Sequence, residues 1–105
     1  MSVLYRFENI IKYKKDGQSY IEKMQIIDSE VGISFEYTYK KGENDFYQIK
    51  ALKPENGIYK VTEIKNKTKD MMDINYEELL KLLKINKKLK FVKDYIEKER
   101  KKYIK

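Results

Sequence analysis

The chain has 105 residues, of which 41% are hydrophobic and 39% are charged, and its formal net charge is +7 at pH 7. This length suits a single domain, residues 1–105, with one small core, and no stretch approaches the roughly 20 apolar residues of a membrane-crossing helix. Cysteine and histidine are absent, which excludes disulfides, thiolate or imidazole metal sites, and Ser-His or Cys-His catalysis. We therefore expect no enzyme, and no catalytic residue, metal or cofactor.

The composition indicates an A+T-rich genome, because the sequence holds 22 lysines and only 2 arginines. Low-GC bacteria, their phages and some large DNA viruses encode proteins of this kind, so a viral or phage accessory protein is one interpretation. The first residues lack a basic segment followed by an apolar one, and no signal peptide is expected. The expected location is the cytoplasm, or the host cell or virion if the protein is viral.

The first two segments are predicted to pair as a β-hairpin. Alternation over residues 3–13 places a set of large apolar side chains on one face of a strand. Asp16-Gly17 is a strong signal for a tight turn, because glycine supplies the positive φ that such turns require. The return strand is expected at 19–28. The apolar face of the first strand comprises Val3, Tyr5, Phe7, Ile11 and Tyr13.

The strongest strand signal lies at 31–40, where apolar residues alternate strictly with Gly32, Ser34, Glu36, Thr38 and Lys40. Its apolar members on one face are Val31, Ile33, Phe35, Tyr37 and Tyr39, and we expect Ile33, Phe35, Tyr37 and Tyr39 to face the helices. Turns at 42–45 and 54–57 then delimit strands at 46–53 and 58–65. Because short turns join consecutive strands, residues 1–66 are predicted to form an antiparallel five-stranded β-meander.

The hydrophobic period changes after Asp70, and residues 70–105 are predicted to be helical. Asn75 and Glu78 have the spacing of a capping box, which begins a helix, and Asn86 is expected to interrupt it. A second helix is predicted at 87–102, with the apolar stripe Leu89, Val92, Ile96 and Tyr103. The predicted fold class is α+β, with two C-terminal α-helices packed on one face of the sheet.

A cluster of apolar residues at 79–83 is broader than one helix face requires. Its leucines, Leu79, Leu80, Leu82 and Leu83, cover much of the helix circumference. An exposed apolar patch of this kind is sticky, and a symmetric dimer is a common way to cover it. Either the strands wrap around this cluster or a second copy of the protein covers part of it, and the sequence favours the homodimer.

The positive charge is concentrated at the C-terminus. Residues 1–83 are neutral overall, whereas residues 84–105 hold ten basic residues against Asp94, Glu97 and Glu99. Three interpretations compete: a solvated helix whose cations complement the helix dipole, a surface that binds nucleic-acid phosphates, and a surface that packs on an acidic protein or a membrane. The predicted anion-binding residues are Lys87, Lys88, Lys90, Lys93, Lys98, Arg100, Lys101, Lys102 and Lys105.

Three other groups of residues have a functional and a structural interpretation. Tyr37, Tyr39, Tyr47 and Tyr59 are expected to be core residues rather than a platform for stacked bases. Glu63-Ile64-Lys65 matches a nuclease-type Glu-x-Lys triplet, but chance alone predicts about as many such triplets as occur. Asp70, Asp73 and Glu77 would share a helix face and could bind Mg²⁺, although acidic residues before a helix are ordinary.

The sequence favours a non-enzymatic binding or assembly protein. In the preferred hypothesis, its basic C-terminal helix contacts nucleic-acid phosphates without strong sequence specificity, because lysine suits backbone contacts and the bidentate arginine contacts to guanine are scarce. The alternative hypothesis is a protein-interaction or virion component that acts as a homodimer.

Overall fold

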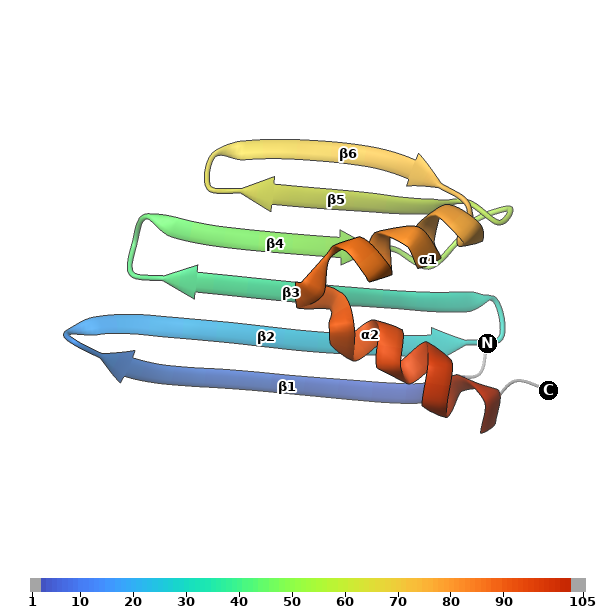
Figure 1. Ribbon diagram of the computed structural model, residues 1–105, viewed down its shortest axis with the longest axis horizontal. Helices are drawn as coiled ribbons and strands as arrows, with labels where there is room; N and C mark the ends of the chain where they lie inside the picture. Colours follow the sequence, from blue (N-terminus) through green and yellow to red (C-terminus); the bar gives the residue numbers. More distant parts are fainter. Residues whose placement is uncertain (1–2, 103–105) are drawn as a thin grey trace.

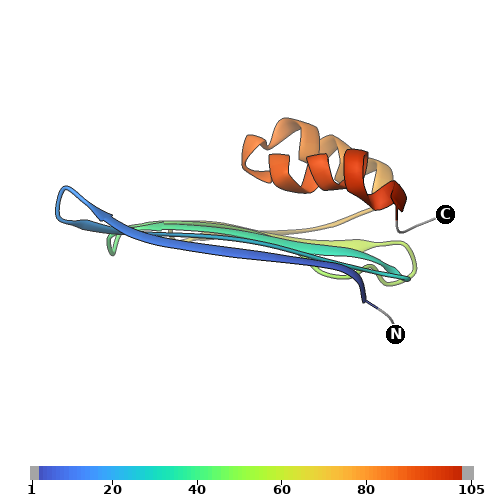
Figure 2. The same ribbon diagram turned by 90° about the horizontal axis from the view of Figure 1, so that it is seen from below.

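The computed structural model describes residues 3–102, which form an antiparallel sheet with a layer of helices on one face (Figures 1 and 2). The six strands lie side by side in chain order, as short turns between consecutive strands require. The predicted α+β class and antiparallel meander are therefore confirmed. The strands are β1 (Val3–Lys15), β2 (Gln18–Ser29), β3 (Gly32–Lys41), β4 (Asp45–Ala51), β5 (Tyr59–Lys65) and β6 (Thr68–Ile74).

The first hairpin turn forms where the sequence predicts it. Asp16 and Gly17 have φ angles of 52° and 77°, the two consecutive positive values that a tight two-residue hairpin turn needs. The loop between β4 and β5 uses the same device, with φ angles of 53° at Asn56 and 78° at Gly57. Local turn chemistry thus determines where these strands reverse.

The predicted count of five strands is wrong, because residues 68–74 form a sixth strand instead of the start of the helical part. The turn before it contains no glycine, and Asn66 adopts the left-handed conformation with a φ of 55°. Asn66 is fixed by Phe46, whose backbone N–H donates to Asn66 Oδ1 at 2.9 Å and whose carbonyl accepts from Asn66 N at 2.7 Å. The turn is thus stabilised by a neighbouring strand that is distant in sequence.

The helical layer begins at residue 76. Asn75 and Glu78 form the predicted capping box, since each side chain accepts a hydrogen bond from the other residue's backbone N–H. Asn86 ends the first helix as predicted, and its Oδ1 accepts from Lys88 N at 3.0 Å. Within residues 3–102, no helix is long and apolar enough to cross a membrane. The helical elements are α1 (Tyr76–Ile85), η1 (Lys87–Leu89), α2 (Lys90–Asp94), η2 (Tyr95–Glu99) and η3 (Arg100–Lys102).

The hydrophobic core lies between the helices and one face of the sheet. Ile33, Phe35 and Tyr37 are buried there, which confirms the predicted core face of β3, whereas Tyr39 is half-buried and Val31 is exposed. The other buried apolar residues are Ile26, Ile49, Ala51, Tyr59, Val61, Ile74, Leu79, Leu83, Leu89, Val92 and Tyr95.

The leucine cluster of α1 packs on the chain's own sheet. Leu79 and Leu83 are buried, and Leu80 and Leu82 are partly buried against the same core, while Ile85 is 79% exposed. The excess apolar area that favoured a homodimer is therefore largely covered within one chain. The homodimer remains a prediction, and the leucine cluster no longer supports it.

Two predicted apolar faces are corrected. In the second helix Tyr95 is buried and Ile96 is only partly buried, because Tyr95 follows the buried Val92 by three residues on one helix face and its hydroxyl donates to the buried Asp28. Tyr103, the last residue of that stripe, lies outside the described residues. In β1, the pairing register shifts between Val3 and Tyr5, so Val3 does not share the face of Tyr5 and Phe7.

The helices cover only part of the sheet. Figure 2 shows them over one face, which we call the covered face, while the opposite face is bare and is called the open face. Figure 1 shows that they lie near the end where β6 leads into α1, called here the helix end. The turns β1–β2, β3–β4 and β5–β6 lie at the other end, the hairpin end. The molecule measures 48 × 26 × 25 Å, so much of its length at the hairpin end is bare on both faces.

Candidate anion-binding site

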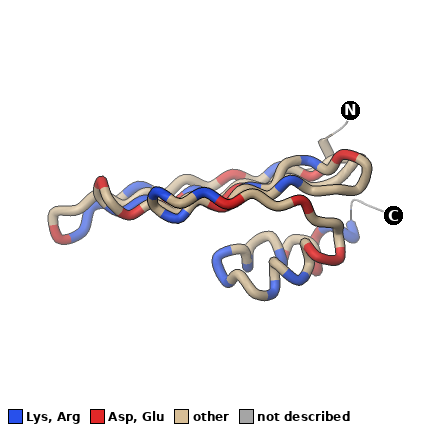
Figure 3. The backbone as a smooth tube through the Cα atoms, turned by 90° about the horizontal axis from the view of Figure 1, so that it is seen from above, with Lys and Arg blue, Asp and Glu red and all other residues tan. Residues whose placement is uncertain are grey.

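The predicted anion-binding residues lie in the helical layer, which carries a large share of the basic residues (Figure 3). The structure divides them into two groups. Arg100 and Lys88 are held against the sheet and contribute to the fold, whereas most of the other cations lie in solvent. Lys105 lies outside the described residues.

Arg100 attaches the end of the helical layer to β2. Its Nε donates a hydrogen bond to Asp28 Oδ2 at 2.9 Å, and the same oxygen accepts from the Tyr95 hydroxyl at 2.7 Å. Arg100 Nη1 also donates to the Tyr76 hydroxyl at 3.1 Å. The Asp28 side chain is fully buried and that of Arg100 is 18% exposed. Arg100 is therefore a structural residue, and its prediction as a ligand residue loses support.

Burial and the Asp28 carboxylate shift the pKa values of the two residues that bind it, Tyr95 and Arg100. Burial and the hydrogen bond to Asp28 raise the pKa of Tyr95 well above the ordinary tyrosine value of 10. Burial alone would lower the pKa of Arg100, but its hydrogen bond and charge attraction to Asp28 outweigh that effect and raise it. The cluster thus holds one anion and one cation together under the helices.

Lys88 lies over three tyrosine rings of the covered face. Its Nζ is 5.5 Å from the ring centroid of Tyr37, 5.3 Å from that of Tyr39 and 5.8 Å from that of Tyr47. Each distance falls within the range of a cation–π interaction. Lys88 therefore fixes the turn between α1 and α2 over the sheet, although its side chain remains exposed.

The tyrosines beneath Lys88 are ordered by carboxylates. Tyr37 donates to Glu22 at 2.7 Å, and Tyr47 donates to Glu63 at 2.7 Å and accepts from Asn86 Nδ2 at 2.8 Å. Burial and the bond to Glu63 raise the pKa of Tyr47 to about 12. Tyr37 and Tyr59 are buried as predicted, and Tyr39 and Tyr47 are half-buried at the edge of the core.

Two further cations have acidic neighbours in the same helical segment. Lys93 Nζ is 3.4 Å from Glu97 Oε1, and Lys102 Nζ is 3.4 Å from Glu99 Oε2. Both pairs are substantially exposed, and pairs of this kind contribute about 0–1 kcal/mol to stability. Each pair therefore cancels one positive charge of the segment but adds little to the stability of the helix.

The remaining cations of the segment are exposed and, within residues 3–102, have no salt bridge. We call them the unpaired lysines, and they are Lys84, Lys87, Lys90, Lys98 and Lys101. Four of them were predicted ligand residues, and Lys84 adds a fifth. Lys87 and Lys101 are separated by about 21 Å along the helical segment at 1.5 Å per residue. The unpaired lysines therefore form a long basic surface rather than a compact pocket.

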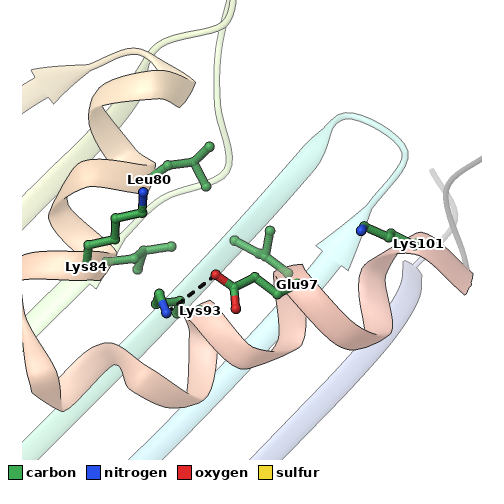
Figure 4. Close-up of a pocket in the computed structure, with 7 residues that line it drawn as sticks. Leu80, Lys84, Lys93, Glu97 and Lys101 are labelled. Carbon is green, nitrogen blue, oxygen red and sulfur yellow. Dashed lines mark ion pairs between the residues drawn. The ribbon is translucent and has the colours of Figure 1, made fainter.

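A groove of about 330 Å³ lies between α1 and the helical segment that follows it (Figure 4). Its floor is formed by Leu80, Leu83 and Ile96, while Lys84 and Lys101 contribute cations. Lys93 and Glu97 line the same groove and are joined by their ion pair in Figure 4. The groove thus combines apolar surface with a net positive charge.

The candidate metal and nuclease residues do not assemble. Asp70 and Asp73 lie on β6, where an odd spacing places their side chains on opposite faces, so the predicted shared helix face is wrong. Glu63 accepts from Tyr47 and lies 3.9 Å from Lys65, both contacts within the sheet. Among residues 3–102, no cluster of three or more potential metal ligands occurs.

The sheet distributes its charge unevenly between its two faces, which counting along the sequence does not reveal. Because alternate residues of a strand point to opposite faces, the register assigns eight basic and three acidic side chains to the open face. A residue count along the chain averages the two faces and gives neutrality. The basic members are Arg6, Lys12, Lys14, Lys23, Lys40, Lys50, Lys60 and Lys69, and the acidic members are Glu8, Glu36 and Asp73.

No protein-family model matches the sequence, and neither a curated protein nor a solved structure shows significant similarity to it. The functional argument therefore depends on the arrangement of charges and apolar groups described above.

Proposed function

We propose that the protein is a non-enzymatic nucleic-acid-binding protein whose unpaired lysines contact the phosphate backbone. One observation carries this proposal: five exposed lysines lie in the short segment 84–101 and have no salt bridge to any residue that the structure describes. The acids of this segment do not neutralise them: Glu97 and Glu99 pair with Lys93 and Lys102, and Asp94 forms no salt bridge within residues 3–102. A polyanion is the partner that such a surface attracts.

The chemistry of these residues favours backbone contacts over base reading. A lysine ammonium is a compact point charge that binds phosphate, whereas sequence is read mainly by planar, bidentate groups such as arginine. The single arginine of the helical layer, Arg100, is occupied by Asp28 and Tyr76. We therefore expect affinity that depends weakly on sequence and steeply on salt.

Salt titration of a labelled mixed-sequence DNA duplex, followed by fluorescence anisotropy, tests the proposal. Each neutralised phosphate contributes about −0.9 to the slope of log K against log salt. The double variant Lys98→Glu with Lys101→Glu should weaken binding to all sequences alike and flatten the slope by about two units. Absence of binding by the parent protein at about 50 mM salt would remove the proposal.

A matched control is available on the open face. Lys50→Glu with Lys60→Glu makes the same change in net charge at two exposed lysines on the face of the sheet opposite the helical layer. This variant should retain most of the affinity and the slope. An equal loss in both variants would show that net charge alone drives binding.

The second candidate is an acidic protein partner, favoured by the apolar floor of the groove between α1 and η2, which phosphates do not require. A protein segment with carboxylates around one apolar side chain fits both parts of the groove. Leu80→Ser should then abolish capture of that partner while leaving binding to DNA unchanged. The predicted homodimer is tested separately by light scattering, where it requires a mass near twice 12.8 kDa.

A further inference from the structure

The hairpin end of the open face combines lysines with apolar side chains. Lys12, Ile21, Lys40 and Phe46 lie opposite one another across β1 to β4, which makes a row of alternating cation and apolar group. The next row begins with Ile10 and Lys23 and ends with Ile64 and Lys69. We call these two rows, together with Lys14 beside them, the open-face patch.

The strand positions of the open-face patch contain no acidic residue. The acids of the open face, Glu8, Glu36 and Asp73, lie in rows nearer the helix end, and Glu36 is already 3.6 Å from Lys23. Asp16 and Glu43 lie beyond the rows, in the hairpin turns. Lys12, Lys14, Lys40 and Lys69 are exposed and, among the described residues, have no salt bridge. The patch is therefore strongly cationic.

The shape of this surface limits what it can contact with all its lysines at once. Figure 2 shows the sheet edge-on as a shallow layer, and no described segment lies beneath its hairpin end, so the backbone that carries the patch is broad and nearly flat. A duplex is a cylinder and touches a flat surface along a narrow line. A planar anionic surface contacts every lysine of the patch together.

The apolar members of the patch favour the same partner. Ile10 is 49% exposed, and Ile21, Phe46 and Ile64 are half-buried between the lysines. Isoleucine offers no stack to a nucleic-acid base and no hydrogen bond to a phosphate. At a bilayer interface, by contrast, apolar side chains enter the acyl boundary while lysine stems lie along it and keep their ammonium groups at the headgroups.

We propose that the open-face patch is a peripheral binding surface for anionic lipid membranes, separate from the lysines of the helical layer. Four to eight clustered cations are the usual number for recognition of anionic headgroups. The sheet would lie flat on the bilayer with its helices directed toward the aqueous phase. This inference does not depend on the proposed binding of nucleic acid.

Co-sedimentation with vesicles of phosphatidylcholine containing about 30% phosphatidylglycerol tests the inference. The parent protein should sediment with these vesicles, bind pure phosphatidylcholine vesicles at least tenfold less and lose binding as salt rises. Equal binding to both vesicle types, or none to either, would overturn the inference.

Adjacent residues supply a matched pair of variants. Lys12→Glu with Lys40→Glu alters the open-face patch, whereas Lys15→Glu with Lys41→Glu makes the same charge change on the covered face, where Lys41 lies over the Tyr20 ring. The first variant should bind anionic vesicles at least tenfold more weakly, and the second should stay within about twofold of the parent. Equal losses would contradict a face-specific site. If the first variant does not fold, as judged by circular dichroism, Lys14→Glu with Lys69→Glu replaces it.

Testing each variant against both ligands distinguishes the open-face patch from the unpaired lysines of the helical layer. Lys98→Glu with Lys101→Glu should leave vesicle binding within about twofold of the parent, even though it impairs binding to DNA. A loss of vesicle binding in that variant would assign lipid contact to the helical layer and overturn the inference. Loss of DNA binding in the Lys12 and Lys40 variant, without vesicle binding by the parent, would identify nucleic acid as the partner of the open face instead.

Discussion

Aromatic and apolar residues occur along the whole covered face, but they are buried only where the helical layer lies over them. At the helix end, Tyr37 is 4% exposed beneath the helical layer and donates to Glu22. At the hairpin end, Tyr13 is 47% exposed and stacks on Tyr20 with ring centroids 4.7 Å apart. Alternation determines which face a side chain occupies, whereas burial depends on how far the helices reach. An aromatic residue on the apolar face of a strand is therefore a core residue only where a second layer covers it.

The largest difference between the two ends should appear in stability. Phe35→Ala removes a side chain that is 3% exposed and should cost roughly 3–5 kcal/mol, enough to unfold a marginal domain. Ile11→Ala, on the same face at the hairpin end, should cost less than about 1 kcal/mol because Ile11 is 39% exposed. Urea denaturation measures both. Similar losses would contradict the division into a core end and a bare end.

Removal of the buried carboxylate should give the next largest effect. Asp28→Ala leaves Arg100 and Tyr95 without their shared acceptor and should cost roughly 2–3 kcal/mol. The effect should concentrate at the helix end, since η2 and η3 lose their attachment to β2. Hydrogen exchange would then show faster exchange in residues 95–102 than in β3. Unchanged exchange in that segment would show that apolar packing alone holds it.

Alkaline pH should have the next largest effect, on the contact between Tyr47 and the helical layer. Because the folded pKa of Tyr47 is raised to about 12, its contribution is complete below the unfolded value of about 10 and is lost as pH rises toward 12. At about 1.4 kcal/mol per pKa unit, discounted for partial exposure, this loss is at most about 2 kcal/mol. The free energy of unfolding at pH 9 and at pH 11.5 measures it. Tyr47→Phe should show a smaller fall over this window than the parent, and an identical fall would contradict the assignment.

The smallest expected effect concerns the contact that joins the helical layer to the tyrosines. Lys88→Met removes a cation from three tyrosine rings and should cost about 0.5–1 kcal/mol, the range for exposed cation–π interactions. Lys87→Met, at an exposed neighbour, should change stability by less than about 0.5 kcal/mol. Thermal melts of the two variants compare them directly. Equal values would mean that the rings do not stabilise Lys88.

Much of the fold could be predicted because local signals determine it. Asp16-Gly17, the alternation over 33–37 and the capping box at Asn75 act within a few residues and appear in the structure as expected. The sixth strand could not be predicted in the same way, because its turn depends on Asn66 and its hydrogen bonds with Phe46. That contact spans 20 residues and exists only once the sheet has paired.

The candidate site was less predictable for the same reason. Arg100 resembles its lysine neighbours in sequence, and only the fold brings Asp28, 72 residues earlier, within 2.9 Å of it. The charge of the open face was hidden because its lysines alternate with residues of the covered face. The strand pairing was needed to assign these lysines to a face, because it shows whether the odd- or the even-numbered residues of each strand face the helices.

The most direct test of the central claim is a lysine acetylation footprint of the complex with a mixed-sequence DNA duplex, read by mass spectrometry. Acetylation requires an accessible, deprotonated amine, and contact with phosphate both covers the lysine and favours its protonated form, so a lysine that contacts phosphate should react more slowly when DNA is present. The proposed function predicts protection of the unpaired lysines Lys84, Lys87, Lys90, Lys98 and Lys101 and little change at Lys50 and Lys60. Protection spread evenly over all exposed lysines, or confined to the sheet, would contradict it.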